Sequence, residues 1–160
     1  KDILQHYYAA IDVHRDAEVF VGCTLLPNAS NIWTWSLKVS GITYFYDIAR
    51  KMQRPPWGVT ANLCARIRNG TFSENPRFHH VYPKTGGGED IDFCLQYSTK
   101  KASIVSVPKA VVSHPWWHDG NVCLRHICGW SVGDSLCMTR WPDQSYLSAP
   151  NAPESMLILC

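Results

Sequence analysis

The sequence predicts an α/β fold in which helices alternate with the strands of a largely parallel sheet. Three segments, 17–26, 58–67 and 102–112, are rich in the β-branched and aromatic residues typical of strands. The segments between and before them carry apolar residues three and four positions apart, as amphipathic helices do. Strands that alternate with helices predict a layered domain whose sheet is covered by helices.

In the first half of the chain, a helix is expected over 1–11, where apolar residues recur at helical spacing. The strand at 17–26 hardly alternates between apolar and polar residues, so both of its faces should be buried. Turn-forming residues at 27–31 end this strand. A short helix is predicted over 42–52, before the strand at 58–67.

In the second half, the clearest helix is predicted over 90–101. Acidic residues open it and Lys100–Lys101 close it, and both signs suit the helix dipole. Pro108 marks an edge or a bend in the strand at 102–112, because proline cannot donate to a strand ladder. A last helix is expected over 121–130.

The composition is that of an ordinary globular domain. The chain has 160 residues, 46% apolar and 18% charged, which is enough apolar material for one core and argues against disorder. A net charge of +2 is too small to indicate nucleic-acid binding. No stretch approaches the roughly 20 apolar residues that cross a bilayer. The chain does not begin with Met, so we expect it to be a fragment.

Cysteines and glycosylation sequons bear on the compartment. Of the seven cysteines, Cys23, Cys64 and Cys94 lie among apolar neighbours and are expected to be buried thiols, whereas the cysteines at 123, 128 and 137 could pair if oxidised. Sequons at Asn28 and Asn69 are compatible with a secretory route.

The central stretch runs from three consecutive glycines into three acids, at 86–92. Glycine permits positive φ and close approach of a ligand, and acids are favoured in a first helical turn. The stretch therefore fits either a loop with an acidic helix start or a loop that presents Glu89 and Asp90 to a ligand. Adjacent helical residues point about 100° apart, so one acid could hold a hydroxyl while the other accepts its proton. Asp92 is expected to be a solvated or helix-capping acid.

Other candidate residues flank this stretch. His114 ends an apolar strand, where it could bind a divalent metal or be a satisfied structural histidine. Trp116 and Trp117 follow, and tryptophans there either pack in the core or stack on sugar rings. Trp57 either lines a pocket or packs, and Asn62 could serve a ligand or a loop.

Taken in order, these motifs resemble the C-terminal half of inverting glycosyltransferases with the GT-A fold, most closely family 2-like enzymes. The matching residues are Trp57, Gly58, Thr60 and Asn62, then Gly87 to Phe93, then Val112, His114 and Pro115. The resemblance covers roughly 17–151. It implies a Rossmann-like mixed sheet of the nucleotide-diphospho-sugar transferase type, here incomplete. The chain, 1–160, would be the acceptor-side portion of a single catalytic domain.

The resemblance also implies an activity: transfer of a sugar, with inversion, from a nucleotide-sugar donor to a hydroxyl of a carbohydrate or glycoconjugate acceptor. It assigns the catalytic base to Asp90 and acceptor binding to Glu89. It makes His114 a ligand of Mn²⁺ or Mg²⁺. The other residues expected to bind substrate are Gly87, Gly88, Trp57 and Trp116.

One departure from the family pattern concerns the donor site. The family holds metal and nucleotide with an Asp-x-Asp pair earlier in the chain, and no such pair precedes Gly86. We therefore expect the nucleotide-binding half to lie outside this chain, together with any segment that associates with a membrane. The expected location is the Golgi or endoplasmic reticulum membrane, with a cytoplasmic or cell-membrane-associated enzyme as the alternative.

Three other interpretations stay open. The tryptophans fit a non-catalytic carbohydrate-binding domain. A structural zinc site could use His114, His118, Cys123 and Cys128, whose side chains zinc accepts. A cysteine hydrolase built on Cys94 with a nearby histidine is a weaker third, because Cys94 lies on the apolar face of the predicted helix.

Overall fold

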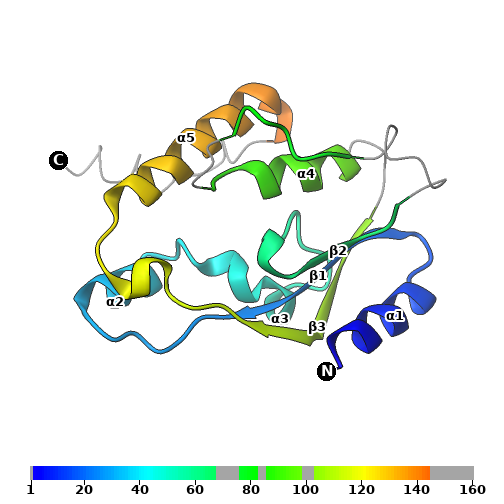
Figure 1. Cartoon of the computed structure of the whole chain (residues 1–160). Helices are drawn as coiled ribbons and strands as arrows, with labels where there is room; N and C mark the ends of the chain where they lie inside the picture. Colours follow the sequence, from blue (N-terminus) through cyan, green and yellow to red (C-terminus); the bar gives the residue numbers. More distant parts are fainter. Residues whose placement is uncertain (1, 68–75, 83–85, 99–102, 145–160) are drawn as a thin grey trace.

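The computed structural model describes residues 2–67, 76–82, 86–98 and 103–144. Helix α1 covers one face of a sheet, α3 and α4 cover the other, and α5 packs on the outer side of α4 (Figure 1). The elements are α1 (Ile3–Val13), β1 (Ala17–Leu25), α2 (Ile32–Val39), η1 (Tyr44–Asp47), α3 (Ile48–Lys51), η2 (Thr60–Asn62), β2 (Leu63–Ala65), α4 (Glu89–Ser98), β3 (Ser103–Ser113), η3 (Trp117–Gly120), α5 (Leu124–Arg140) and η4 (Pro142–Gln144).

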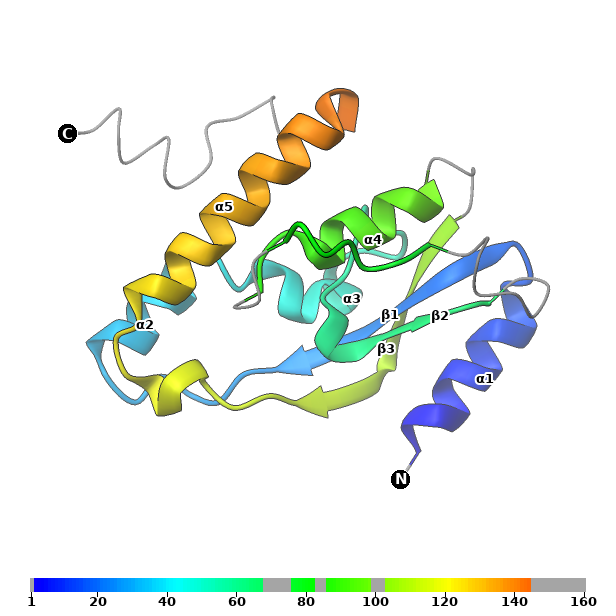
Figure 2. The ribbon, with the colours of Figure 1, turned by 45° about the horizontal axis from the view of Figure 1, so that its top comes forward.

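The sheet has the order β2-β1-β3 and is mixed (Figure 2). Strand β1 runs parallel to β3 and antiparallel to β2. The α/β class is therefore confirmed, and so is the mixed sheet that the family resemblance implies, whereas the largely parallel sheet expected from the alternation of strands and helices is wrong. The reason is that β2 starts beside Val21, in the middle of β1, and runs back along it to Val19. A parallel neighbour would have required a crossover to the start of β1.

Strand β1 is buried on both faces, as its sequence predicts. Val19 and Val21 pack with Ile48 of α3 and with α4, while Phe20 faces α1 and packs against Tyr7. Since apolar residues follow one another without polar interruption, both covering layers gain a hydrophobic contact from one strand.

Asn62 closes a break in the β1–β3 ladder. The pairing passes from Gly22 with Val107 to Cys23 with Val111, so three residues around Pro108 bulge out of β3. The side-chain nitrogen of Asn62 donates to the carbonyl oxygens of Cys23 and Ala110, at 2.8 Å each. Its Oδ1 accepts from the Tyr7 hydroxyl at 2.7 Å. Asn62 thus satisfies backbone groups that the bulge leaves unpaired, and its role is structural.

Several element boundaries differ from the prediction. Helix α2 falls just after the predicted turn, and Asn31 and Thr34 form its capping box. The strand expected over 58–67 is reduced to β2, preceded by the turn η2. The last helix extends to Arg140 rather than ending near residue 130. None of the helices in the described ranges combines the length and the apolar character needed to cross a bilayer.

Some expectations concern residues outside the described ranges. These are the sequon at Asn69, the Lys100–Lys101 pair and the end of the family resemblance at residue 151.

Candidate carboxylate site and aromatic hollow

The glycine loop adopts the conformation that its sequence predicts. Gly86, Gly87 and Gly88 have φ values of 85°, 131° and 80°, a region that other residues rarely adopt. The carbonyl of Gly88 accepts a hydrogen bond from the backbone N–H of Asp92 at 2.9 Å and so starts α4. The loop consequently delivers Glu89 and Asp90 at the first turn of a helix, where the dipole favours acids.

The loop is seated on two glycines of α5. A Cβ placed on Gly133 would lie 1.9 Å from the carbonyl oxygen of Gly87, and one on Gly87 would lie 2.6 Å from the oxygen of Gly129. Backbone touches backbone, because a side chain at these positions would collide with main-chain atoms that cannot move aside. The glycines of α5 therefore fix the distance between the loop backbone and the backbone of α5.

Glu89 and Asp90 have different surroundings. The Glu89 carboxylate folds back and accepts the backbone N–H of Gly87 at 2.5 Å, which leaves its second oxygen to contact a ligand. Asp90 is only partly exposed, and its Oδ1 accepts from the N–H of Ile91 at 2.9 Å. Burial, followed by the charge of Glu89, raises the pKa of Asp90 to about 7. Asp90 therefore changes protonation near neutral pH, where a general base works best.

Two further residues approach this pair, and their place beside it was not predicted from the sequence. Tyr46 of η1 has its pKa raised by burial and then by the charges of Asp90 and Glu89. Asp134 of α5 has its pKa raised by burial, and its charge in turn raises the pKa of Asp90. Both come from elements remote in sequence. The stretch Gly133-Asp134-Ser135 is part of the family resemblance, but nothing in the sequence assigns Asp134 or Tyr46 a role beside Asp90.

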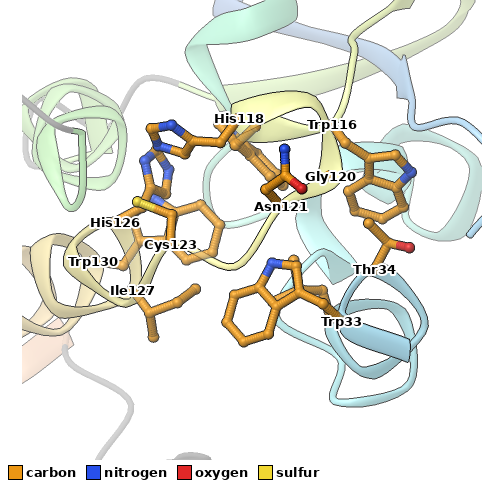
Figure 3. A pocket seen from close by; sticks show the side chains of 12 residues that line it. Trp33, Thr34, Trp116, His118, Gly120, Asn121, Cys123, His126, Ile127 and Trp130 are labelled. Atoms are coloured by element: carbon orange, nitrogen blue, oxygen red, sulfur yellow. The ribbon is translucent and has the colours of Figure 1, made fainter. Parts of the chain in front are cut away.

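An aromatic hollow opens between α2, η3 and the start of α5 (Figure 3). Tryptophans from all three elements form most of its wall, and polar groups are few. It is lined by Trp33, Thr34, Leu37, Trp116, Trp117, His118, Gly120, Asn121, Cys123, His126, Ile127 and Trp130. The hollow adjoins the glycine loop, because the Cα of Trp130 occupies the space that a side chain on Gly87 would need.

Two histidines, His118 and His126, line the hollow together with the polar residues Thr34 and Asn121. Nε2 of His126 is buried and has no hydrogen-bond partner among the described residues. Burial, and then the neighbouring His118, lower the pKa of His126, so its ring is neutral at pH 7. His118 and Asp119 have φ of 51° and 52°, and two consecutive non-glycine residues in this region are strained. Strain of this kind concentrates at functional sites.

The predicted histidine and tryptophans occupy different places. His114 contacts Tyr46 edge-on and Trp117 at a tilt, with ring centroids 6.1 and 5.4 Å apart, so it touches one residue near the carboxylates and one that lines the hollow. Trp116 is buried in the hollow's wall, and its indole N–H donates to the Asn28 carbonyl at 3.2 Å. Trp57 instead packs in the core, stacked on Phe45 at 3.9 Å, and does not line the hollow.

Asp92 is fully buried, so the expectation of a solvated acid is wrong. Its Oδ1 accepts from Nε of Arg140 at 2.8 Å and from the indole N–H of Trp141 at 2.7 Å. Its Oδ2 accepts from Gln96 at 2.9 Å. The reason is that α5 continues past α4, and its end closes over Asp92. The acid thereby ties the end of α5 to the first turn of α4.

The described residues contain no group of three or more His, Cys, Asp or Glu side chains that could hold a metal. His114, His118, Cys123 and Cys128 are all described, and they do not form such a group in the structure. The six described cysteines are free thiols, so the pairing considered for 123, 128 and 137 is not formed. Cys94 is fully buried and its pKa is raised to about 12 by burial, which does not suit a nucleophile.

The comparisons with known proteins give no match: no protein-family model fits the chain, and no curated protein or solved structure is significantly similar to it. A function for the chain therefore has to be inferred from the geometry and chemistry of the site.

Proposed function

We propose that the chain is the acceptor side of an inverting glycosyltransferase with Asp90 as its catalytic base. The observation that carries the proposal is Asp90 itself, a carboxylate whose pKa is raised to about 7. The glycine loop that precedes it adjoins the aromatic hollow through the contact of Gly87 with Trp130. A carboxylate with that proton affinity is a stronger base than an ordinary surface aspartate. It is still deprotonated in half or more of the molecules at pH 7 and above.

In this mechanism the ionised Asp90 removes the proton from an acceptor hydroxyl. The hydroxyl oxygen forms a bond to the anomeric carbon of the donor sugar while the bond from that carbon to the diphosphate oxygen breaks. The proton stays on Asp90, the nucleoside diphosphate leaves, and attack from the opposite face inverts the anomeric centre. Glu89 would orient the acceptor through the oxygen that the loop does not engage.

The interior of the hollow has room for about one water molecule, so a carbohydrate acceptor would lie across its mouth rather than inside it. Tryptophan rings stack on the C–H faces of a sugar, and Trp117 and Trp130, which are half-buried in the lining, would contribute their exposed parts to such a contact. The unpartnered Nε2 of His126 would bond a sugar hydroxyl, which satisfies a buried polar atom. The strain at His118 and Asp119 is consistent with a rim held in place for binding.

The expected Mn²⁺ or Mg²⁺ fits this chain only in part. The Nδ1 of His114 lies 2.6 Å from the carbonyl oxygen of Pro115, which can only accept, so Nδ1 carries the proton and Nε2 is left for a metal. Yet no three suitable side chains gather among the described residues. Further ligands would have to come from the rest of the protein.

The test uses the intact protein that contains this chain and a panel of nucleotide sugars with saccharide and glycolipid acceptors. Release of nucleoside diphosphate that depends on the acceptor is expected for the wild type. Asp90→Asn should lower kcat by about 10²–10⁴-fold, because that is the usual contribution of a general base. Asp143→Asn is the matched control, since Asp143 is an exposed acid in η4. Transfer by Asp90→Asn at the wild-type rate would refute the role of Asp90.

A non-catalytic carbohydrate-binding domain is the second candidate, and the aromatic hollow favours it. Such a protein would bind glycans equally well with Asp90 or its asparagine variant and would show no turnover in either form. Binding isotherms of both variants with the same acceptor panel separate the two functions.

A further inference from the structure

Asp134 lies on the side of α5 that faces the start of α4. The positions 130, 134, 137 and 141 follow one another at spacings of three and four, so they share one face of the helix. Trp130 abuts the glycine loop, and the Cys137 thiol donates to the carbonyl of Gly88 at 3.1 Å. The Trp141 indole reaches Asp92. Asp134 therefore occupies the middle of a stripe whose other members all contact the first turn of α4 or the loop before it.

The contacts on either side of Asp134 are rigid ones. Gly133, its immediate neighbour, touches the backbone of Gly87 and Gly88. Beyond it, Arg140 is bound to the buried Asp92 at 2.8 Å. The backbone at Asp134 thus cannot move away from the loop without breaking the docking of α5 on α4.

The ionisable groups around Asp90 in the described part of the chain are all acidic. The titratable groups that face Asp90 are Glu89 and Cys94 on α4, Tyr46 on η1, and Asp134 and Cys137 on α5. All of these become negative when they ionise. Among the described residues, neither Asp90 nor Asp134 forms an ion pair, and Asp134 has no hydrogen-bond partner. Carboxylates that share a partly buried place without a cation hold on to protons.

We propose that Asp134, held near Asp90 by the docking of α5, moves to higher pH the point at which the catalytic base gains and loses its proton. Asp134 is a positioning residue that acts on Asp90 through its charge and does not touch the reacting atoms. The raised pKa of Asp90 agrees with this role, because burial and Glu89 raise it first and Asp134 adds to them. The consequence for catalysis rests on the proposed function, whereas the effect on Asp90 does not.

The experiment measures Asp90 directly by ¹³C NMR of the intact protein labelled at its aspartate carboxyls, with the Asp90 resonance assigned by its loss in Asp90→Asn. Removing the negative charge with Asp134→Asn should move the titration midpoint of Asp90 to lower pH. Asp134→Glu keeps the charge and should stay close to the wild type, and the exposed control Asp143→Asn should not move it. A midpoint in Asp134→Asn equal to the wild type, or a shift no larger than the control's, overturns the proposal.

The pH profile of kcat/KM provides the second readout. The acid limb should move to lower pH in Asp134→Asn by the same amount as the Asp90 midpoint, and the plateau should fall modestly because a weaker base transfers protons more slowly. If the wild type shows no transfer at all, the proposed function fails, and the NMR titration still decides the role of Asp134. An acid limb that stays in place while the Asp90 midpoint moves would refute Asp90 as the base that limits the rate.

Discussion

Replacing Asp90 by asparagine should stabilise the protein at alkaline pH. The native pKa of Asp90 is raised from 3.8 to about 7, so between these values the native state holds a proton that the unfolded chain has lost. The native state therefore loses stability as the pH rises from about 4 to 7. At about 1.36 kcal/mol per pH unit, the full difference is worth about 4 kcal/mol above pH 7. Asparagine never ionises, and its side-chain oxygen can still accept the N–H of Ile91.

Urea unfolding followed by tryptophan fluorescence measures this effect, since the chain has seven tryptophans. At pH 8, Asp90→Asn should exceed the wild type by about 1–4 kcal/mol, the lower part of the range allowing for solvent at the exposed edge of Asp90. The difference should nearly vanish at pH 4. Asp143→Asn should show no such pH dependence. If Asp90→Asn is no more stable than the wild type at pH 8, or if its advantage is the same at both pH values, the account of Asp90 is wrong.

Two further predictions concern the docking of α5. Gly133→Ala should lower the free energy of unfolding by about 2–3 kcal/mol, because its Cβ would lie 1.9 Å from the backbone oxygen of Gly87. Gly41→Ala has open space and carries only the strain of φ +78°, about 1–2 kcal/mol, so equal losses in urea unfolding would contradict the contact. Asp92→Ala should cost about 1–3 kcal/mol, because the indole N–H of Trp141 and the side chain of Gln96 lose their buried acceptor, whereas Arg140 is exposed enough to be solvated. Asp92→Asn should cost less because an oxygen acceptor remains, and a thermal or urea denaturation in which both variants match the wild type would refute this role.

The sequence predicts those elements whose signals are local. β1 and α4 lie within a few residues of the predicted ranges, because an uninterrupted β-branched run and an acidic helix start are contained in single segments. The predicted end of α5 is too early, because Gly129 and Gly133 weaken a helical pattern. In the structure these glycines allow the close approach of the loop, which is a tertiary requirement that helix propensity does not express.

The candidate site divides in the same way. Glu89 and Asp90 are contiguous, so the motif that contains them indicates both. Tyr46, Asp134 and His126 reach the site from other elements, and their types and spacings are unremarkable in the sequence. Asp92 is contiguous with the acidic motif, yet its burial depends on Arg140 and Trp141 at the end of α5. The acidic residues at the start of α4 give no sign of that distant contact.

The backbone contact between the glycine loop and α5 also determines how movement would pass through the site. A side chain between two elements can change rotamer and absorb a displacement, but Gly87 and Gly133 meet through main-chain atoms alone. The start of α5 forms one wall of the hollow and its middle supports the loop. A ligand that tilts α5 on entering the hollow would therefore displace Glu89 and Asp90 with it, so filling the hollow and aligning the carboxylates would be a single mechanical event.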